Sequence, residues 1–435
     1  MIDSGDVVKL YRQHVNSGMA RLAGLVGMAT ETRASGSLVY DENDRAYLDC
    51  GGYGVFIAGH CHPTIVSAVR AQLERHPLGT RSMLSRELAS AASTLAAVAP
   101  GELRYVCFAN SGAEASEIGV KIARLNGKST LISMHGGFHG KTLGALSISG
   151  RPRYRIPFEP LLPGVEHVAF GSAELVDAAV ARHGDACCVI VEPVQGEAGV
   201  IIPPHGYLRD VQAICRRHGA MLMLDEIQTG LGRLGTWWGA DREGITPDVM
   251  LVGKGLSGGC VPVAAAVVTP RAFEALNRDP LLHTSTFAGS PLATSAARAA
   301  IEVIRDEDLV GRAESIGARL LGSIRTIIQE SCPDLVVGVR GMGLLIGIEF
   351  AADHIAGDFI LELIQLRIVV STSLNAPRVV RFTPPAVLSE KEIDWLLGAI
   401  REAAVTIRSR HAPASRTGIE RFRHSMLCVH NGRPA

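Results

Sequence analysis

The chain has 435 residues, of which 43 are basic and 43 are acidic, so its formal net charge at pH 7 is zero. A balanced charge gives no global attraction to nucleic acid or to an anionic membrane, and we expect neither as a partner. Hydrophobic residues make up 47% of the sequence, which excludes a disordered chain. No apolar run approaches the roughly 18 residues that cross a bilayer, and the N-terminus lacks a signal-peptide pattern. We therefore expect a cytoplasmic globular protein of two or three domains.

Between residues 104 and 270, short β-branched runs alternate with segments of helical period. This alternation predicts a parallel sheet flanked by helices. The predicted strands are Arg104–Phe108, Thr130–Met134, Cys187–Glu192, Met221–Asp225, Asp248–Gly253 and Val261–Val268, and the predicted helices are Ala113–Arg124 and Tyr207–His218. A ligand of an open parallel sheet binds beyond the carboxyl ends of the strands, so the residues after each strand are the first candidates for a site.

A long helical segment, Pro291–Ile304 continuing through Leu321–Gln329, separates this sheet from a second module that begins near Leu335. In that module we predict strands at Val336–Val339, Leu344–Phe350, Val369–Thr372 and Val379–Phe382, and helices at Phe359–Gln365 and Glu390–Ser409. Segregated strands and helices predict a smaller α+β domain. Residues 410–435 contain five arginines and one glutamate without periodicity, and we expect an irregular basic tail there.

Two charged residues follow neighbouring predicted strands. Asp225 closes the apolar run 221–224, and a carboxylate at this position must lie at the sheet edge to avoid an unpaired charge in the core. Lys254 follows the next strand and is flanked by glycines at 253, 255, 258 and 259, which allow a ligand to approach the backbone. Burial can lower the pKa of such a lysine, as a Schiff-base nucleophile requires. The ordinary interpretation of Asp225 is a helix N-cap, and that of Lys254 is a solvated lysine in a loop.

Two further segments lie at predicted strand ends. Asn110–Glu114 joins a strand to a helix, so its backbone N–H groups, with Ser111 and Gly112, form either a phosphate cradle or an ordinary helix cap. His135–Gly140 places Phe138 and two histidines at the same edge. Phe138 is either a stacking ring for a flat heterocycle or a core residue.

Other chemistries have weaker signals. Gly255–Gly259 matches the nucleophile elbow of serine hydrolases formally, with Ser257 as nucleophile, but the elbow should lead into a helix and Val261–Val268 is predicted to be a strand. We expect no metal site. His135 and His139 lack the glutamate of the zinc-protease helix, and His60–His62 is too compact to bind a metal without distant ligands.

A phosphate cradle, an aromatic ring, a strand-end aspartate and a strand-end lysine follow one another in the order needed to hold pyridoxal phosphate. The sequence closely resembles the class III (ω-type) pyridoxal-phosphate-dependent aminotransferases of fold type I from about residue 39 to residue 401. The motifs that carry the resemblance are Gly59–Pro63, Asn110–Glu114, Phe138–Thr142, Glu192–Glu197, Leu224–Gly230, Lys254, Thr286–Phe287 and Arg381–Pro385. The resemblance implies a large cofactor-binding domain at 59–310, a small domain at 311–409 to which residues 1–58 contribute, and the tail 410–435.

The resemblance also implies roles for single residues. Lys254 would form the Schiff base with pyridoxal 5'-phosphate and shuttle a proton, and Asp225 would keep the pyridine nitrogen protonated. The other implied cofactor contacts are Ser111, Gly112 and Ala113 at the phosphate, Phe138 with His139 at the ring, and Gln228 at the ring oxygen. Thr286 would reach the cofactor phosphate of the partner subunit, which implies a homodimer with shared sites.

Glu197 and Arg381 imply two alternating substrates. In ornithine- and aminobutyrate-type relatives, an arginine at this position binds a substrate carboxylate and pairs with the glutamate when an amine without an α-carboxylate enters. The pair implies ping-pong transfer of an amino group between a terminal primary amine, or its aldehyde, and 2-oxoglutarate or glutamate. Tyr53 aligns with a substrate-pocket position.

Among the branches of the family, the chain most resembles putrescine aminotransferase, so a diamine is the first expectation for the amine. The segments that carry this likeness are Gly140–Ser147, Pro160–Gly164, Leu282–Phe287 and Arg367–Val370. The chain departs from the family pattern at Ala288, Ser290 and Ala113. A larger aldehyde from secondary or peptide biosynthesis is therefore the alternative substrate, and an aminomutase would make poor use of Glu197 and Arg381.

Overall fold

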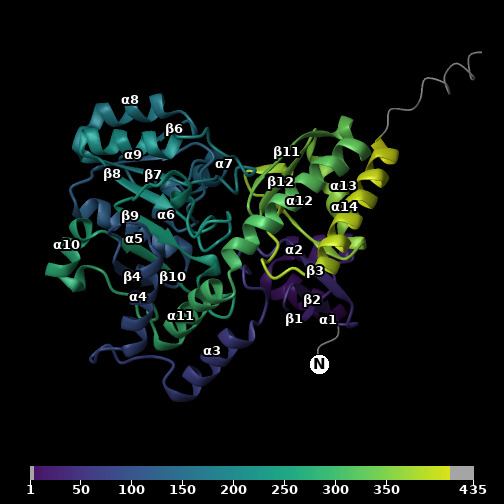
Figure 1. The fold of residues 1–435 in the computed structure, drawn as a ribbon, viewed down its shortest axis with the longest axis horizontal. Coiled ribbons are helices and arrows are strands. Elements are labelled where there is room, and N and C mark those ends of the chain that lie inside the picture. Colours follow the sequence, from purple (N-terminus) through teal and green to yellow (C-terminus); the bar gives the residue numbers. More distant parts are fainter. Residues whose placement is uncertain (1–3, 412–435) are drawn as a thin grey trace, which may run out of the picture.

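The computed structural model describes residues 4–411 of the chain. A large α/β part lies beside a smaller part that contains two further sheets and three long helices (Figure 1). This arrangement confirms the predicted fold class, a mostly parallel sheet flanked by helices together with a smaller α+β part.

The large part is built on a seven-stranded sheet with the order β4-β10-β9-β8-β7-β5-β6. Its strands are β4 (Tyr105–Ala109), β5 (Thr130–Met134), β6 (Val165–Val168), β7 (Cys187–Val191), β8 (Met221–Asp225), β9 (Val249–Val252) and β10 (Ala264–Val268). All neighbours are parallel except at β10, which runs antiparallel to β4 and β9. β6 was not predicted from the sequence, because this four-residue edge strand contains a charged residue and is only partly buried.

Helices cover both faces of the sheet because successive side chains of a strand point to opposite faces. Met221 and Met223 face a core that includes α5 and α10, whereas Leu222 and Leu224 face a larger core that includes α8, α9 and α11. The helices of the large part are α3 (Pro63–Arg75), α4 (Arg86–Val98), α5 (Gly112–Leu125), α6 (Leu143–Ile148), α7 (Pro152–Arg155), α8 (Ala173–His183), α9 (Tyr207–His218), α10 (Pro270–Arg278) and α11 (Pro291–Asp306).

The smaller part combines both ends of the described chain. An antiparallel sheet with the order β11-β12-β15-β14 packs with the C-terminal helices, and a second sheet has the order β1-β2-β3-β13. The strands are β1 (Glu31–Ser35), β2 (Leu38–Asp41), β3 (Ala46–Asp49), β11 (Val336–Met342), β12 (Leu345–Phe350), β13 (Ile368–Val369), β14 (Ser371–Ser373) and β15 (Ala376–Phe382). The helices are α1 (Ser4–Leu10), a π-helix (Tyr11–Val15), α2 (Ser17–Val26), α12 (Leu309–Ser331), α13 (Asp353–Gln365) and α14 (Glu390–His411). In Figure 1 the purple N-terminal elements therefore lie against the yellow α14.

Two predicted elements differ in the structure. The predicted strand Val369–Thr372 is two strands of different sheets, because β13 pairs with β3 and β14 pairs with β15. The chain changes sheets at Val370, whose backbone packs closely on Gly51. A Cβ atom on Gly51 would lie 3.1 Å from the Val370 backbone. The predicted helical segment 291–329 is two helices, since Asp308 adopts a φ of +47° and its side chain caps the N-terminus of α12.

The last helix runs further than predicted. α14 continues through Arg410 and His411, two residues that we assigned to the irregular tail. Both are held on α13: Arg410 Nη2 lies 2.6 Å from Glu362 Oε1, and His411 Nε2 lies 2.7 Å from Asp358 Oδ2. The rest of the predicted tail, 412–435, lies outside the described residues. Of the helices in the described range, none has the length and apolar character needed to cross a bilayer.

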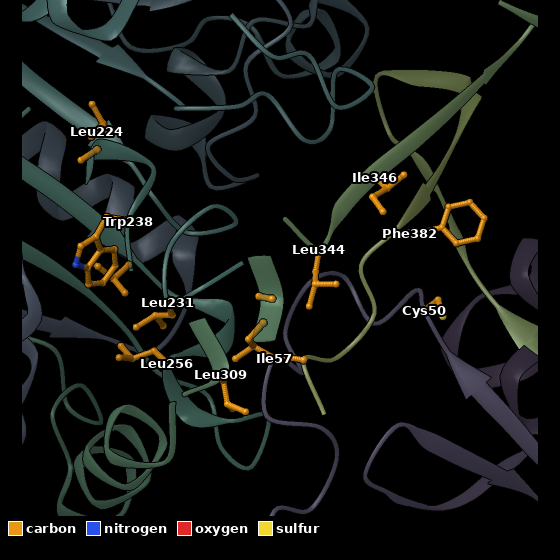
Figure 2. Packing of buried hydrophobic residues seen from close by; sticks show 14 of the residues in the cluster. Cys50, Ile57, Leu224, Leu231, Trp238, Leu256, Leu309, Leu344, Ile346 and Phe382 are labelled. Carbon is orange, nitrogen blue, oxygen red and sulfur yellow. The ribbon is translucent and has the colours of Figure 1, made fainter. Parts of the chain in front are cut away.

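One hydrophobic core connects the two parts (Figure 2). Leu231 and Ile57 approach Leu344 from the side of the large part, and Ile346 and Phe382 continue the cluster into the smaller sheet. All five side chains are at most 2% exposed. The smaller sheet is thus packed directly onto the loops that follow β8, which positions its residues near the carboxyl edge of the large sheet.

We expect Leu344→Ala to destabilise the protein by about 2–5 kcal/mol, because truncation of this fully buried side chain leaves a cavity between the two parts. Urea denaturation followed by tryptophan fluorescence measures the loss. The matched control is Leu361→Ala on α13, where the leucine is 37% exposed and its removal should cost much less. Equal losses for the two variants would contradict a core that is continuous through Leu344.

Candidate active site

Three charged residues lie where three neighbouring parallel strands end. Glu192 follows β7, Asp225 is the last residue of β8, and Lys254 follows β9 by two positions. Parallel strands end at the same edge of a sheet, so these side chains share one region. Glu192 and Asp225 are buried and Lys254 is partly buried. Asp225 and Lys254 were predicted as site residues from their strand ends, whereas Glu192 was not, although it also follows a strand.

Asp225 is fixed by two hydrogen bonds. His139 Nδ1 lies 2.6 Å from Asp225 Oδ2, and the backbone N–H of Ile227 donates to Oδ1 at 3.0 Å. Since the carboxylate accepts, Nδ1 of this fully buried ring carries the proton. The backbone of His139 is itself anchored, because its N–H donates to Ser149 Oγ and its carbonyl accepts from Ser116 Oγ. His139 thus orients the aspartate carboxylate.

Lys254 begins a short 3₁₀ helix (Lys254–Ser257) with a φ of +45°, a backbone conformation that side chains other than glycine rarely adopt. Burial lowers the pKa of its ammonium group from 10.5, and the positive charge of Arg381 lowers it further. The carboxylates of Glu197 and Asp225 oppose this shift. At a given pH, a larger fraction of Lys254 than of a lysine with the ordinary pKa is therefore the neutral amine. The neutral amine is the form that acts as nucleophile and base.

Glu192 is a carboxyl group among other negative charges. Burial raises its pKa well above the usual range, and the neighbouring Asp225 raises it further. Its Oε2 atom accepts a hydrogen bond of 3.3 Å from the backbone N–H of Phe138, the residue predicted to stack on a ring. Glu192 therefore holds the loop that carries Phe138 against the end of β7.

The predicted phosphate cradle lies at the N-terminus of α5. Ser111 is the N-cap residue, and its hydroxyl accepts from the backbone N–H of Glu114 at 3.2 Å. Gly112 and Ala113 open the helix, where free N–H groups favour an anion. Backbone packing is tight here: a Cβ atom on Gly140 would lie 2.6 Å from the Ala113 methyl group. Gly140 thus brings the loop that carries Phe138 and His139 onto the cradle.

Gln228 lies between this edge and the N-terminal loop. A Cβ atom on Gly54 would lie 3.8 Å from Gln228 Nε2 and 3.9 Å from Lys254 Cδ, which places the three residues together. A Cβ atom on Gly196 would overlap Gln228 Oε1. Nε2 is buried and has no hydrogen-bond partner within residues 4–411. An unpartnered buried donor beside the lysine fits a ligand oxygen such as the ring oxygen of pyridoxal phosphate.

The smaller part adds Arg381 of β15, a fully buried arginine. Its Nη1 lies 2.7 Å from Glu197 Oε1. The approach is not aligned for a hydrogen bond, and both Nη1 and Nε have no hydrogen-bond partner in the described part of the chain. The other oxygen of Glu197 accepts from the backbone N–H of Leu374 at 2.9 Å, so Glu197 is anchored independently of Arg381. The guanidinium retains donors for a carboxylate of a ligand.

Two predicted site residues are not brought into this buried cluster. Tyr53 has a φ of +51° and is 66% exposed, and Thr286 is exposed on the loop before α11.

The structure also weakens the hydrolase interpretation, because Ser257 is buried and the chain continues into the antiparallel strand β10 instead of a helix. Over residues 4–411, no group of three or more His, Cys, Asp or Glu side chains could hold a metal ion.

The chain is similar to known proteins in sequence and in fold. Residues 24–404 match the family model of class III aminotransferases. An ornithine aminotransferase from Toxoplasma gondii is 30% identical over 94% of this chain and 96% of that chain, with a TM-score of 0.87, and its structure has partial occupancy of PLP. An (S)-enantioselective ω-transaminase from Thermomicrobium roseum is 28% identical over 94% and 99% of the chains, with a TM-score of 0.85. An ω-transaminase from Pseudomonas jessenii, in complex with PMP, is 26% identical over 91% and 96% of the chains, with a TM-score of 0.84.

The lowered pKa of Lys254 predicts how it is labelled. In the cofactor-free enzyme, acetic anhydride should acetylate Lys254 at lower pH than it acetylates a lysine in an unstructured peptide, within a series from about pH 7 to pH 10. Peptide mass spectrometry measures the extent at each pH. Arg381→Met removes a charge that lowers this pKa, so its profile should move to higher pH. Coincident profiles for Lys254 and the peptide lysine would contradict the assignment.

Proposed function

Because this chain belongs to the class III aminotransferases, a family of transaminases that bind pyridoxal phosphate, we propose that it moves an amino group between a terminal primary amine, or its aldehyde, and 2-oxoglutarate or glutamate. Arg381 carries this proposal. A buried guanidinium with two unpartnered nitrogens is costly unless a carboxylate binds it, and Glu197 Oε1 lies near Nη1 without forming an aligned hydrogen bond. The arrangement supports a pocket that accepts a carboxylate substrate and closes on Glu197 when a simple amine enters.

The residues present fit the cofactor. Bound pyridoxal phosphate supplies a carbonyl group that takes up the amino group and a ring that stabilises negative charge on the substrate carbon. In this proposal Ser111, Gly112 and Ala113 hold the phosphate, and the buried Nε2 of Gln228 donates to the ring oxygen. Phe138 would pack against the ring.

Two residues handle protons. Asp225, oriented by His139 and by the backbone N–H of Ile227, presents a carboxylate oxygen that binds a protonated ring nitrogen. Lys254 Nζ takes a proton from the substrate carbon and returns it, which its lowered pKa favours at neutral pH. Burial of Asp225 and Glu197 keeps bulk water from competing for these contacts.

For the amine, the likeness to the putrescine branch makes a diamine the first candidate. The altered residues Ala288 and Ser290 lie on the loop before α11 and motivate the alternative, a larger aldehyde. An aminomutase moves an amino group within one molecule and has no second substrate. The pair Glu197–Arg381, which we propose distinguishes two substrates, would then have no use.

A homodimer is the proposed assembly, because large apolar side chains are exposed on two adjacent loops. Arg81 Nε donates to the Thr286 carbonyl at 3.3 Å and so ties the loops together. The exposed residues are Met83 (84%), Leu84 (104%), Leu281 (81%) and Phe287 (62%). Large exposed apolar side chains on adjacent loops are typical of a protein interface. Thr286 would then contribute to the site of the partner subunit.

The activity is tested with putrescine, cadaverine and a bulky primary amine or aldehyde, with 2-oxoglutarate or glutamate as the second substrate. We expect 2-oxoglutarate-dependent turnover that Lys254→Ala abolishes, together with the violet absorbance of the cofactor bound to the lysine. Arg381→Met should raise KM for 2-oxoglutarate by about 10–100-fold, because it removes the charged donors for the carboxylate.

Two results would count against this proposal. If no amine yields glutamate, or if Lys254→Ala keeps full activity, the proposed reaction is wrong. If both diamines are inert and the bulky aldehyde is aminated with glutamate as donor, the reaction stands and the diamine is replaced by the larger substrate.

The assembly is tested by light scattering after size-exclusion chromatography. The unmodified enzyme should elute at twice the chain mass of 46.1 kDa, and Leu84→Asp with Phe287→Asp should elute at the mass of one chain and lose activity. Val405→Asp on α14 is the control, since this valine is 56% exposed but lies on a different element. A fully active single chain would overturn the shared-site proposal.

A further inference from the structure

Arg233 is a second fully buried arginine near the site, and it has no acidic hydrogen-bond partner in residues 4–411. Its guanidinium binds three backbone carbonyls instead. Nη1 donates to Pro384 O at 2.5 Å and to Leu344 O at 3.3 Å, and Nη2 donates to Gly54 O at 3.4 Å. These contacts join segments separated by more than a hundred residues from Arg233.

The carbonyls belong to segments that carry proposed substrate residues. Pro384 lies three residues after Arg381, and Leu344 precedes β12, whose Gly347 pairs with Arg381 of β15. Both of the shorter bonds therefore go to the side of the structure that carries Arg381. Figure 2 shows Leu344 at the junction between the two parts of the core.

The third and longest bond goes to the loop beside the cofactor site. Gly54 follows Tyr53 and lies next to Gln228 and Lys254. Arg233 itself belongs to the loop after β8, five residues beyond Gln228. Its backbone is also fixed to the smaller part, because its carbonyl accepts from the N–H of Leu344 at 2.9 Å.

Charge adds to this geometry. Burial lowers the pKa of Arg233 to about 10 against the opposing charge of Asp49, and the positive charge of Arg381 contributes to this lowering. Arg233 and Arg381 thus act on each other as like charges in a buried region. A carboxylate bound at Arg381 would be attracted by both, whereas a neutral or cationic group would not.

We propose that Arg233 is a positioning residue that holds β15 and its Arg381 at the correct distance from Lys254 and selects carboxylate substrates in the second half-reaction. This inference rests on the proposed function, in which Arg381 binds the carboxylate. Two of the three carbonyl contacts lie on the side that carries Arg381, which predicts a stronger effect on the carboxylate substrate than on the amine. A purely structural arginine would instead affect both half-reactions alike.

The experiment compares Arg233→Met and Arg233→Lys with the unmodified holoenzyme. Binding of glutarate, a dicarboxylate without a reactive keto group, is measured by calorimetry on the holoenzyme, and each half-reaction is followed by single-turnover absorbance. We expect Arg233→Met to weaken glutarate binding at least about tenfold, because it removes both the buried charge and the carbonyl contacts. Arg233→Lys retains the charge and should bind glutarate with intermediate affinity. The amine half-reaction should change less than about threefold in both variants.

The matched control is Arg312→Met. Arg312 also binds backbone carbonyls of the same C-terminal segment, Ala386 O at 2.8 Å and Leu388 O at 3.0 Å. It should leave glutarate binding unchanged. If the methionine variant does not fold, the comparison of arginine with lysine at position 233 decides the outcome.

The inference is overturned if either variant, Arg233→Lys or Arg233→Met, binds glutarate as tightly as the unmodified enzyme does. It is also overturned if both half-reactions slow by the same factor. Failure of the proposed function gives a different result: the unmodified enzyme itself then neither binds glutarate nor reacts with 2-oxoglutarate. The two failures are therefore distinguishable.

Discussion

An ionised side chain is not stable when it lies unpaired inside a sheet, and this constraint organises the site. Glu192, Asp225 and Lys254 follow apolar strands that are parallel, so all three are placed at one edge. The antiparallel strand β10 ends at the opposite edge of the sheet. It has no charged residue along its length, so it adds none to the site. His139 completes the arrangement, because its buried ring orients the Asp225 carboxylate from a loop that is itself held by Glu192 through the neighbouring Phe138.

Two buried arginines connect this edge to the smaller part. Arg381 faces Glu197 and keeps unpartnered nitrogens, as expected for a group that exchanges one carboxylate for another. Arg233 binds carbonyls and keeps its charge near Arg381. Both arginines are desolvated at a cost in stability, which well-packed apolar side chains of similar volume would avoid. Carboxylate recognition, the role that we propose for both, would account for this cost.

The strands that form the middle of the large sheet were predictable because their apolar runs are continuous and end in polar residues. The edge strand β6 was not, since its polar residues Glu166 and His167 break the apolar pattern. The segment 369–372 has the composition of one strand, yet its two halves pair with β3 and β15, which are far apart in the chain. Asp225 and Lys254 followed from strand ends, whereas the role of Arg233 left no signal in the residues around it.

The amino-acid pattern alone was sufficient for the parallel sheet, the strand-end charges and the glycine-flanked lysine, because these features depend on residues that are close in the chain. The identity of the cofactor came from the order of several such motifs. The contacts of Arg381 with Glu197, of His139 with Asp225 and of Arg233 with Pro384 depend instead on how distant elements pack. Side-chain distance and burial in these pairs depend on residues that are far apart in the chain, and no local periodicity encodes them.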